Sequence, residues 1–317
     1  MQVSEPLPQF SISVAARSGS SFISILTLLG LCMALTNTGA AATETGVDRT
    51  LVHDGRTREY RLYVPPGLDR TKQVPLVFAL HGGGGDAAKE EGRVPYNEFA
   101  QRDGWIVVYP NGVERHWNDL RGYEGFISHT ENVDDVGMIE TILDQLSDEF
   151  AIDANRVFVT GGSNGGMMSF TVAAGLADRV AAIAPMVGSM ARPVYETFKP
   201  SRPVSLLMIN DKGDPRVKWE GGPGGRANIV SVPDTLAIWS AFIDCDSSQT
   251  TSAEAIPGQV DDARVSHTVW SGCSDKVHME LYVVEANKHG HPKAIIDKKN
   301  GRHVHEVIWR FFKRSGR

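Results

Sequence analysis

The sequence predicts an α/β fold in which a mostly parallel central sheet carries helices on both faces. From Thr57 onward, short apolar runs alternate with stretches whose apolar residues recur at helical spacing. Strands that are separated by helices typically pair in parallel, and the helices then cover both faces of the sheet. Neither an internal repeat nor a second domain boundary interrupts this pattern. We therefore expect one domain over residues 43–317.

The first half of the pattern contains four predicted strands and three predicted helices. Apolar runs rich in valine, isoleucine, phenylalanine and tyrosine predict the strands, at residues 60–65, 74–82, 105–110 and 156–161. The clearest helix covers residues 134–151, because its apolar residues lie at helical spacing and acidic residues open its first turn. The other two helices are expected at 97–104 and from about residue 164.

The second half continues the alternation up to a final helix. Apolar runs predict strands at residues 180–188, 203–210, 265–270 and 278–286, and helical spacing predicts helices at 233–243 and 303–313. Glycines between Trp219 and Ala227 predict a loop. The segment 246–262 has few apolar residues, so we expect it to lie on the surface.

Composition and charge narrow the class of protein. Of the 317 residues, 22% are charged and 41% hydrophobic, as in ordinary globular proteins. The formal net charge is −6 and the isoelectric point about 5.9. A nucleic-acid partner is not expected, because binding phosphates requires a basic patch and no run of like charges is present.

The N-terminus predicts export. Residues 22–36 form an uncharged apolar run that is too short to cross a bilayer, which takes about 20 residues, but suits a signal-peptide core. Arg17 precedes this run and alanines at 40–42 provide a cleavage pattern, so we predict a signal peptide over residues 1–42, a secreted protein (extracellular or periplasmic) and no stable membrane anchor. The alternative is an uncleaved anchor. Lipidation at Cys32 is not expected, because a leucine precedes it.

The mature chain would retain two cysteines, Cys245 and Cys273. An even number of cysteines in an oxidising compartment favours a disulfide. Two separate buried thiols are the alternative.

The segment Gly161–Gly165 has the pattern G-x-S-x-G between a predicted strand and a predicted helix. In α/β-hydrolases this context holds a serine on a sharp turn, and glycines let the strand and the helix approach closely. Because a serine hydroxyl is a poor nucleophile at neutral pH, it needs a histidine base. We therefore predict an α/β-hydrolase fold with Ser163 as nucleophile and the backbone N–H of Asn164 as an oxyanion donor.

A second signal is the run His81–Gly85, a histidine followed by four glycines at the end of a strand. Glycines at this place form the oxyanion-hole loop of esterases, and we expect Gly83 to be the second donor. We also assign His81 to substrate binding. A phosphate-binding loop is excluded, because no lysine follows the glycines in the required pattern.

The acid and the base should follow the serine in the order acid, then histidine. Asp211 and Asp214 both lie just after a strand, with Asp214 favoured because it is further into the turn. His289 and His291 compete for the base, with His303 and His305 as outsiders on the last helix. No metal is expected, because H-E-x-x-H is absent and the last two histidines do not share a helix face.

Taken together in order, these motifs resemble the polyhydroxybutyrate depolymerase and feruloyl esterase group of secreted α/β-hydrolases. The resemblance covers roughly residues 57–312. Its pieces are LHGGGG (80–85), YPNG (109–112), WND (117–119), DDVG (134–137), TGGSNGGMMS (160–169), GDPRVKWEGG (213–222) and IWRFF (308–312).

The resemblance implies roles that the residues alone leave open. The acid of this group precedes a proline and an E-G-G turn, which implies Asp214. Its histidine, aligned on the following proline, implies His289. The group often has cysteines near positions 245 and 273, which supports the bridge. Trp117 corresponds to a tryptophan near the mouth of the cleft, where it would contact substrate.

The expected activity is carboxylic-ester hydrolysis through an acyl-enzyme, without a cofactor. Its substrate would be a polyester, or a feruloyl or acetyl ester linked to polysaccharide. The chain departs from the group at residues 286–288, where glycines are usual, at His291, where tryptophan is usual, and at residues 210–211, where histidine and glycine are usual. The alternatives are a non-catalytic binding protein on the same scaffold, or a peptidase or lipase of this fold.

Overall fold

The computed structural model describes residues 45–253, 264–292 and 304–316. The predicted signal peptide, residues 1–42, lies outside these ranges, as does His303. Within these ranges no helix combines the length and the apolar character needed to cross a membrane.

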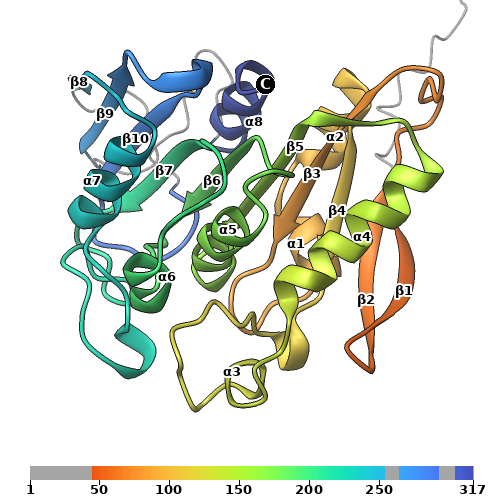
Figure 1. Ribbon diagram of the computed structural model, residues 1–317, viewed down its shortest axis with the longest axis horizontal. Helices are drawn as coiled ribbons and strands as arrows, with labels where there is room; N and C mark the ends of the chain where they lie inside the picture. Colours follow the sequence, from red (N-terminus) through yellow and green to blue (C-terminus); the bar gives the residue numbers. More distant parts are fainter. Residues whose placement is uncertain (1–44, 254–263, 293–303, 317) are drawn as a thin grey trace, which may run out of the picture. The chain divides into compact units, whose positions relative to one another are not determined.

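One sheet forms the centre of the described part of the chain. Its ten strands follow the order β1-β2-β4-β3-β5-β6-β7-β10-β9-β8 (Figure 1). Their bounds are β1 Val47–His53, β2 Arg56–Tyr63, β3 Val74–Leu80, β4 Ile106–Pro110, β5 Ile152–Gly162, β6 Ala182–Met186, β7 Ser205–Asp211, β8 Ser247–Ala253, β9 Arg264–Ser271 and β10 Met279–Glu285.

The six central strands, from β4 to β10 in this order, pair in parallel. The strands at both edges pair antiparallel. The predicted mostly parallel sheet is therefore confirmed.

Two edge strands were absent from the sequence expectation. Strand β1 exposes Val47 and Val52, and β8 has the polar sequence SSQTTSA within a segment for which only a surface position was expected. Edge strands form through backbone pairing with one neighbour and need no continuous apolar run. Apolar patterning therefore has little power to reveal them.

Helices cover both faces of the sheet and bury two separate cores. On β3, Leu76 and Phe78 face one core, while Val77 faces the other. The first core packs against α4, α5, α6 and α7, and the second against α1, α2 and α8. The helix bounds are α1 Ala87–Arg93, α2 Tyr96–Asp103, α3 Ile127–Thr130, α4 Asp135–Glu149, α5 Asn164–Gly175, α6 Arg192–Glu196, α7 Val232–Phe242 and α8 Val304–Arg314.

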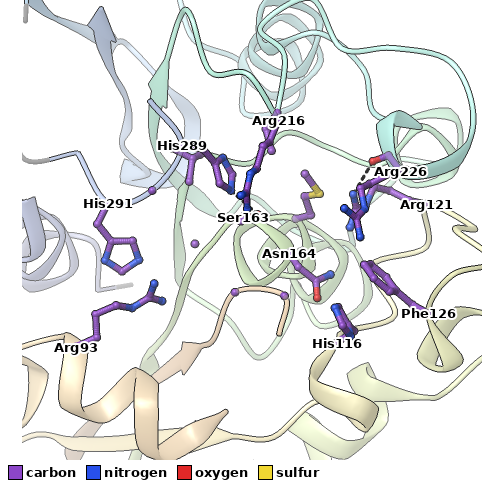
Figure 2. Close-up of a pocket in the computed structure, with 17 residues that line it drawn as sticks. Arg93, His116, Arg121, Phe126, Ser163, Asn164, Arg216, Arg226, His289 and His291 are labelled. Carbon is purple, nitrogen blue, oxygen red and sulfur yellow. Dashed lines mark hydrogen bonds between the residues drawn. The ribbon is translucent and has the colours of Figure 1, made fainter. Parts of the chain in front are cut away.

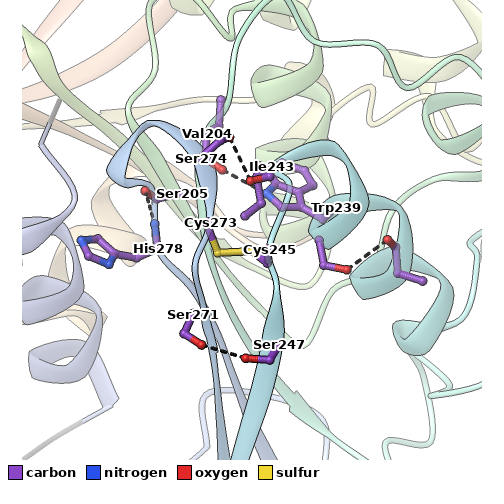
Figure 3. The surroundings of a disulfide bond; sticks show 12 residues. Val204, Ser205, Trp239, Ile243, Cys245, Ser247, Ser271, Cys273, Ser274 and His278 are labelled. Atoms are coloured by element: carbon purple, nitrogen blue, oxygen red, sulfur yellow. Dashed lines mark hydrogen bonds between the residues drawn. A yellow bond between two sulfur atoms is a disulfide. The ribbon is translucent and has the colours of Figure 1, made fainter.

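A disulfide between Cys245 and Cys273 ties the chain after α7 to the end of β9 (Figure 3). Next to it, the N–H of Ser274 donates to the carbonyl of Ile243 at 2.9 Å. The bridge therefore fastens the antiparallel edge of the sheet to the helix that precedes it.

The carboxyl ends of four parallel strands lead to the motifs singled out above. Strand β3 leads to the glycine loop, β5 to Ser163, β7 to Asp214 and β10 to His289. In open α/β sheets, ligands bind beyond the carboxyl ends of the strands. The fold thus gathers the candidate residues on one side of the sheet.

Candidate active site

Ser163 lies on the sharp turn between β5 and α5. Its backbone has φ 56° and ψ −116°, a strained conformation for a residue with a side chain. Its N–H donates to the carbonyl of Met186 on β6 at 2.9 Å. Gly165 allows the turn to close, because a Cβ there would lie 2.4 Å from the carbonyl oxygen of Leu80. The local sequence therefore produces the turn that a nucleophilic serine requires.

A continuous hydrogen-bond chain joins three of the predicted residues. His289 Nε2 lies 3.0 Å from Ser163 Oγ, and His289 Nδ1 lies 2.7 Å from Asp214 Oδ2. The Asp214 side chain is only 1% exposed and that of His289 14% exposed. A buried carboxylate in this position orients an imidazole and stabilises its protonated form.

The two aspartates after β7 have different partners. Asp214 Oδ1 accepts the N–H groups of Arg216 at 2.7 Å and Val217 at 3.0 Å, which leaves Oδ2 for His289. The partners of Asp211 in the described part of the chain are backbone N–H groups. Asp211 accepts the N–H groups of residues 286, 287 and 288 at 3.1 to 3.2 Å. Asp211 therefore fixes the backbone that leads to His289.

The two candidates for the base, His289 and His291, also have different partners. His291 Nδ1 lies 3.0 Å from Nε2 of His305, which in turn contacts the hydroxyl of Tyr96 at 3.0 Å. His305 and Tyr96 are both buried. His291 therefore connects the loop to α8 and α2, while His289 faces the serine.

Gly83 and Asn164 lie side by side at the serine. A Cβ on Gly83 would be 3.6 Å from the Cβ of Asn164, and both residues line the same cavity. Within the described ranges, neither backbone N–H has a hydrogen-bond acceptor. Two free N–H groups next to a serine hydroxyl are what an oxyanion hole requires.

Substrate contact was predicted for Trp117 and His81. Both are buried, and neither belongs to the residues that line the cavity. The indole N–H of Trp117 donates to the carbonyl of His81 at 2.8 Å, and the two rings lie 4.7 Å apart. The motif indicated that they lie near the cleft but not the direction of their side chains, which point inward and support the glycine loop.

His81 is held neutral by its surroundings. Burial lowers its pKa to about 4. Its Nδ1 donates to the carbonyl of Gly82 at 2.8 Å, and its Nε2 accepts the N–H of Gly112 at 3.0 Å. A neutral ring with one donor and one acceptor satisfies both contacts.

A buried network of hydrogen bonds holds the side chain of Asn164. The sequence analysis did not predict this network. The amide of Asn164 accepts the N–H of Trp117 at 2.8 Å and donates to Asp119 Oδ2 at 2.7 Å. Asp119 is fully buried and pairs with Arg121, whose Nε lies 2.9 Å from both carboxylate oxygens. His129 lies 3.5 Å from the same carboxylate, and burial lowers its pKa. The W-N-D motif was a signal for this network.

A cavity of about 410 Å³ lies in front of Ser163 (Figure 2). Four arginines line it, at positions 93, 121, 216 and 226. The remaining lining residues are Gly82, Gly83, His116, Phe126, Gly162, Ser163, Asn164, Met167, Val187, Val217, His289, Gly290 and His291. The sequence did not reveal that these arginines come together.

The parallel sheet, the serine on its strand-to-helix turn and the histidine and carboxylate beside it define the class of the chain as an α/β-hydrolase. Residues 58–206 match the family described as "Esterase PHB depolymerase". Over these residues the chain matches the family that the resemblance predicted.

Several relatives are similar to the chain. Feruloyl esterase C of Emericella nidulans is 27% identical over 230 residues, which cover 71% of this chain and 74% of the relative. The putative esterase NocK of Nocardia uniformis is 32% identical over 187 residues, and the bifunctional acetylxylan esterase/xylanase XynS20E of Neocallimastix patriciarum is 28% identical over 176 residues. The matched regions cover 57% and 55% of this chain, but only 52% and 24% of those two relatives.

Among solved structures, the acetyl xylan esterase from Aspergillus awamori has a TM-score of 0.57. The match covers 84% of this chain and 99% of that one, at 15% identity. It shows that the two chains share the α/β-hydrolase fold.

Proposed function

We propose that the chain is a secreted serine esterase that hydrolyses carboxylic esters through an acyl-enzyme on Ser163. The observation that carries this proposal is the hydrogen-bonded chain from Ser163 through His289 to Asp214, on a strained turn next to two free N–H groups. The match to an esterase family supports it.

The proposed reaction has two halves. Ser163 Oγ attacks the ester carbonyl while His289 Nε2 takes its proton, and Asp214 stabilises the imidazolium that forms. The N–H groups of Gly83 and Asn164 stabilise the oxyanion. His289 then gives its proton to the departing alcohol, and the acyl group remains on the serine. Water, activated by His289, releases the acid and restores the serine. No step in this sequence requires a cofactor.

The proposed substrates are feruloyl or acetyl esters attached to plant polysaccharide, with polyesters as a second possibility. The names of the relatives, feruloyl esterase C and acetylxylan esterase/xylanase XynS20E, support the first class. The cavity volume of about 410 Å³ lies in the range of pockets that bind small molecules, so the cavity can hold the feruloyl or acetyl group of such an ester.

The test uses purified protein from residue 43 onward with p-nitrophenyl acetate, methyl ferulate and a hydroxybutyrate oligomer. We expect Ser163→Ala to abolish turnover, because it removes the nucleophile. Ser169→Ala is the matched control. Ser169 lies on α5, the helix that follows Ser163, and is buried, and its hydroxyl donates to the carbonyl of Gly165 within that helix. Equal activity of Ser163→Ala and wild type would overturn the proposal, as would a wild type that hydrolyses none of these esters.

Secretion is proposed from the predicted signal peptide, and the Cys245–Cys273 bridge supports an oxidising compartment. N-terminal sequencing of the exported protein should give a start near Thr43. Retention of residues 1–42 in the mature protein would contradict cleavage.

A further inference from the structure

The cavity at Ser163 is far more positive than the rest of the chain. The chain has 38 acidic and 32 basic residues and a formal net charge of −6. The described residues that line the cavity nevertheless include four arginines and no carboxylate. This charge distribution opposes the overall composition, so it calls for a specific explanation.

Two of the four arginines are neutralised by neighbours. Arg121 pairs with the buried Asp119, and Arg93 pairs with the buried Glu90. The other two, Arg216 and Arg226, have no ion-pair partner within the described ranges. They are therefore the net positive charges of the cavity wall.

Among the described residues, aromatic rings and not a carboxylate hold Arg226 in place. Its guanidinium lies over the rings of Tyr123 and Phe126, at 5.1 Å and 5.4 Å from their centroids. Its backbone carbonyl accepts a hydrogen bond of 2.7 Å from Arg121. Stacking on aromatic faces orients a guanidinium and leaves its N–H edge available to a ligand.

Arg216 lies earlier in the same connection between β7 and α7, two residues after Asp214. Its backbone N–H donates to Asp214, so the loop that carries this arginine is tied to the proposed acid. Figure 2 shows the side chains of Arg216 and Arg226 directed into the cavity from different parts of this connection. The two guanidinium groups are thus both presented to the space in front of Ser163.

We propose that this cavity selects esters that carry a free carboxylate, which Arg216 and Arg226 bind beside the scissile bond. The proposal rests on ester hydrolysis at Ser163 and names the chemical class of its substrate. An arginine fork matches the two oxygens of a carboxylate and binds it with charge-assisted hydrogen bonds. A cleft lined by charge of one sign also concentrates ligands of the opposite sign.

The free carboxylate can belong to either of two parts of the substrate, the acyl part or the alcohol part of the ester. In the first case, the acyl part is the half-ester of a dicarboxylic acid. In the second case, the alcohol part carries the carboxylate, as in an acylated uronic acid or the acid end of a hydroxyacid oligomer. Both are small anionic esters, and a pair of matched substrates for each side distinguishes them.

For the acyl side, the substrates are mono-p-nitrophenyl adipate and p-nitrophenyl hexanoate, which differ in the terminal carboxylate. For the alcohol side, they are 4-acetoxybenzoate and its methyl ester. The readout is the ratio of kcat/KM for the anionic ester to kcat/KM for its neutral match. We expect a ratio of at least about ten for one pair, the gain of one charge-assisted contact near the surface.

The variants Arg216→Gln and Arg226→Gln test the assignment, and Arg202→Gln is the control. Arg202 is exposed and is not one of the residues that line the cavity. Each cavity variant should lower the ratio about tenfold, whereas the control should keep it. Because the ratio is taken within each variant, a partial loss of folded protein cancels.

Ionic strength provides an independent readout. Raising salt from about 10 mM to about 1 M shortens the screening length from about 30 Å to about 3 Å. We expect the wild-type ratio to fall with salt and the ratio of the double variant to stay level.

The outcomes separate the two proposals. If the wild type hydrolyses the neutral esters with ratios near one that neither variant changes, the carboxylate assignment is wrong and ester hydrolysis stands. If the wild type hydrolyses none of the four esters, ester hydrolysis itself fails.

Discussion

The cavity at Ser163 has two parts that are built in opposite ways. We call the buried network around the side chain of Asn164 the floor, and the exposed Arg216 and Arg226 the rim. On the floor, the side chain of Asn164 is bonded to Trp117 and Asp119, and Asp119 is paired with Arg121, all within the buried interior. On the rim, Arg216 and Arg226 are exposed. A fixed floor suits chemistry, which needs preorganised groups, whereas an open rim suits the recognition of different ligands.

Substitutions in the two parts of the cavity should differ in both the kind and the size of their effects. Changes at the reacting groups should remove activity, changes in the floor should remove stability, and changes in the rim should alter neither the fold nor its stability.

The largest effect is expected at His289. Replacing it by glutamine removes the base, and kcat should fall by about 10⁶. His291→Gln is the matched control, because it lies in the same loop and bonds to His305 instead of the serine. The measurement is kcat on p-nitrophenyl acetate. A larger loss in His291→Gln than in His289→Gln would reverse the assignment of the base.

In the floor, Asp119→Asn should destabilise the protein by about 3–5 kcal/mol, because it leaves the buried Arg121 charge without its partner. Asp144→Asn removes an ion pair to Arg179 at the surface, where the aspartate side chain is 60% exposed, and should cost less than about 1 kcal/mol. Urea unfolding measures both. Equal losses in the two variants would contradict a structural floor.

His81 should make the floor sensitive to acid. Its pKa is about 4 in the folded protein against 6.5 for an ordinary histidine, so the unfolded chain binds more protons between these two values. This contribution to stability is complete above pH 6.5 and is lost as the pH falls toward 4, by about 3 kcal/mol in total.

Unfolding of wild type and His81→Gln across this pH range measures that contribution. The variant should have a lower stability near neutral pH and a shallower dependence on pH. Parallel curves for the two proteins would show that His81 does not titrate as its burial indicates.

The smallest effect is expected at the rim. Arg216→Gln and Arg226→Gln should change the free energy of unfolding by less than about 0.5 kcal/mol, because neither guanidinium has an ion-pair partner within the described part of the chain. A loss of 2 kcal/mol or more, measured by urea unfolding, would place these arginines in the structural floor instead.

Much of this arrangement was predictable from the sequence. The parallel sheet follows from apolar runs that alternate with helices, and the turn at Ser163 follows from glycines that only a close strand-to-helix approach requires. Local patterns of this kind carry their own geometry.

Other features depend on contacts between distant segments. Strand β8 has no apolar pattern, and its pairing with β9 is made by the backbone. The motif that contains Trp117 indicated a position near the cleft, but the direction of the indole depends on its bond to His81, a residue 36 positions earlier. Arg216 and Arg226 lie in the same connection between β7 and α7, but the path of this connection, which brings both side chains to the cavity, depends on contacts with distant residues such as the hydrogen bond from Arg121 to the carbonyl of Arg226.

The late position of His289 in the chain determines when the proposed active site becomes complete during synthesis and folding. Its partner Ser163 lies 126 residues earlier, and the strand that precedes the histidine, β10, pairs with β7 and β9. A ribosome makes the serine turn well before it makes the base. On the proposed mechanism, a growing chain therefore holds an unreactive hydroxyl until β10 joins the sheet, and hydrolysis begins only with nearly complete folding. An exported enzyme of this kind would therefore be inactive until the chain folds outside the cell.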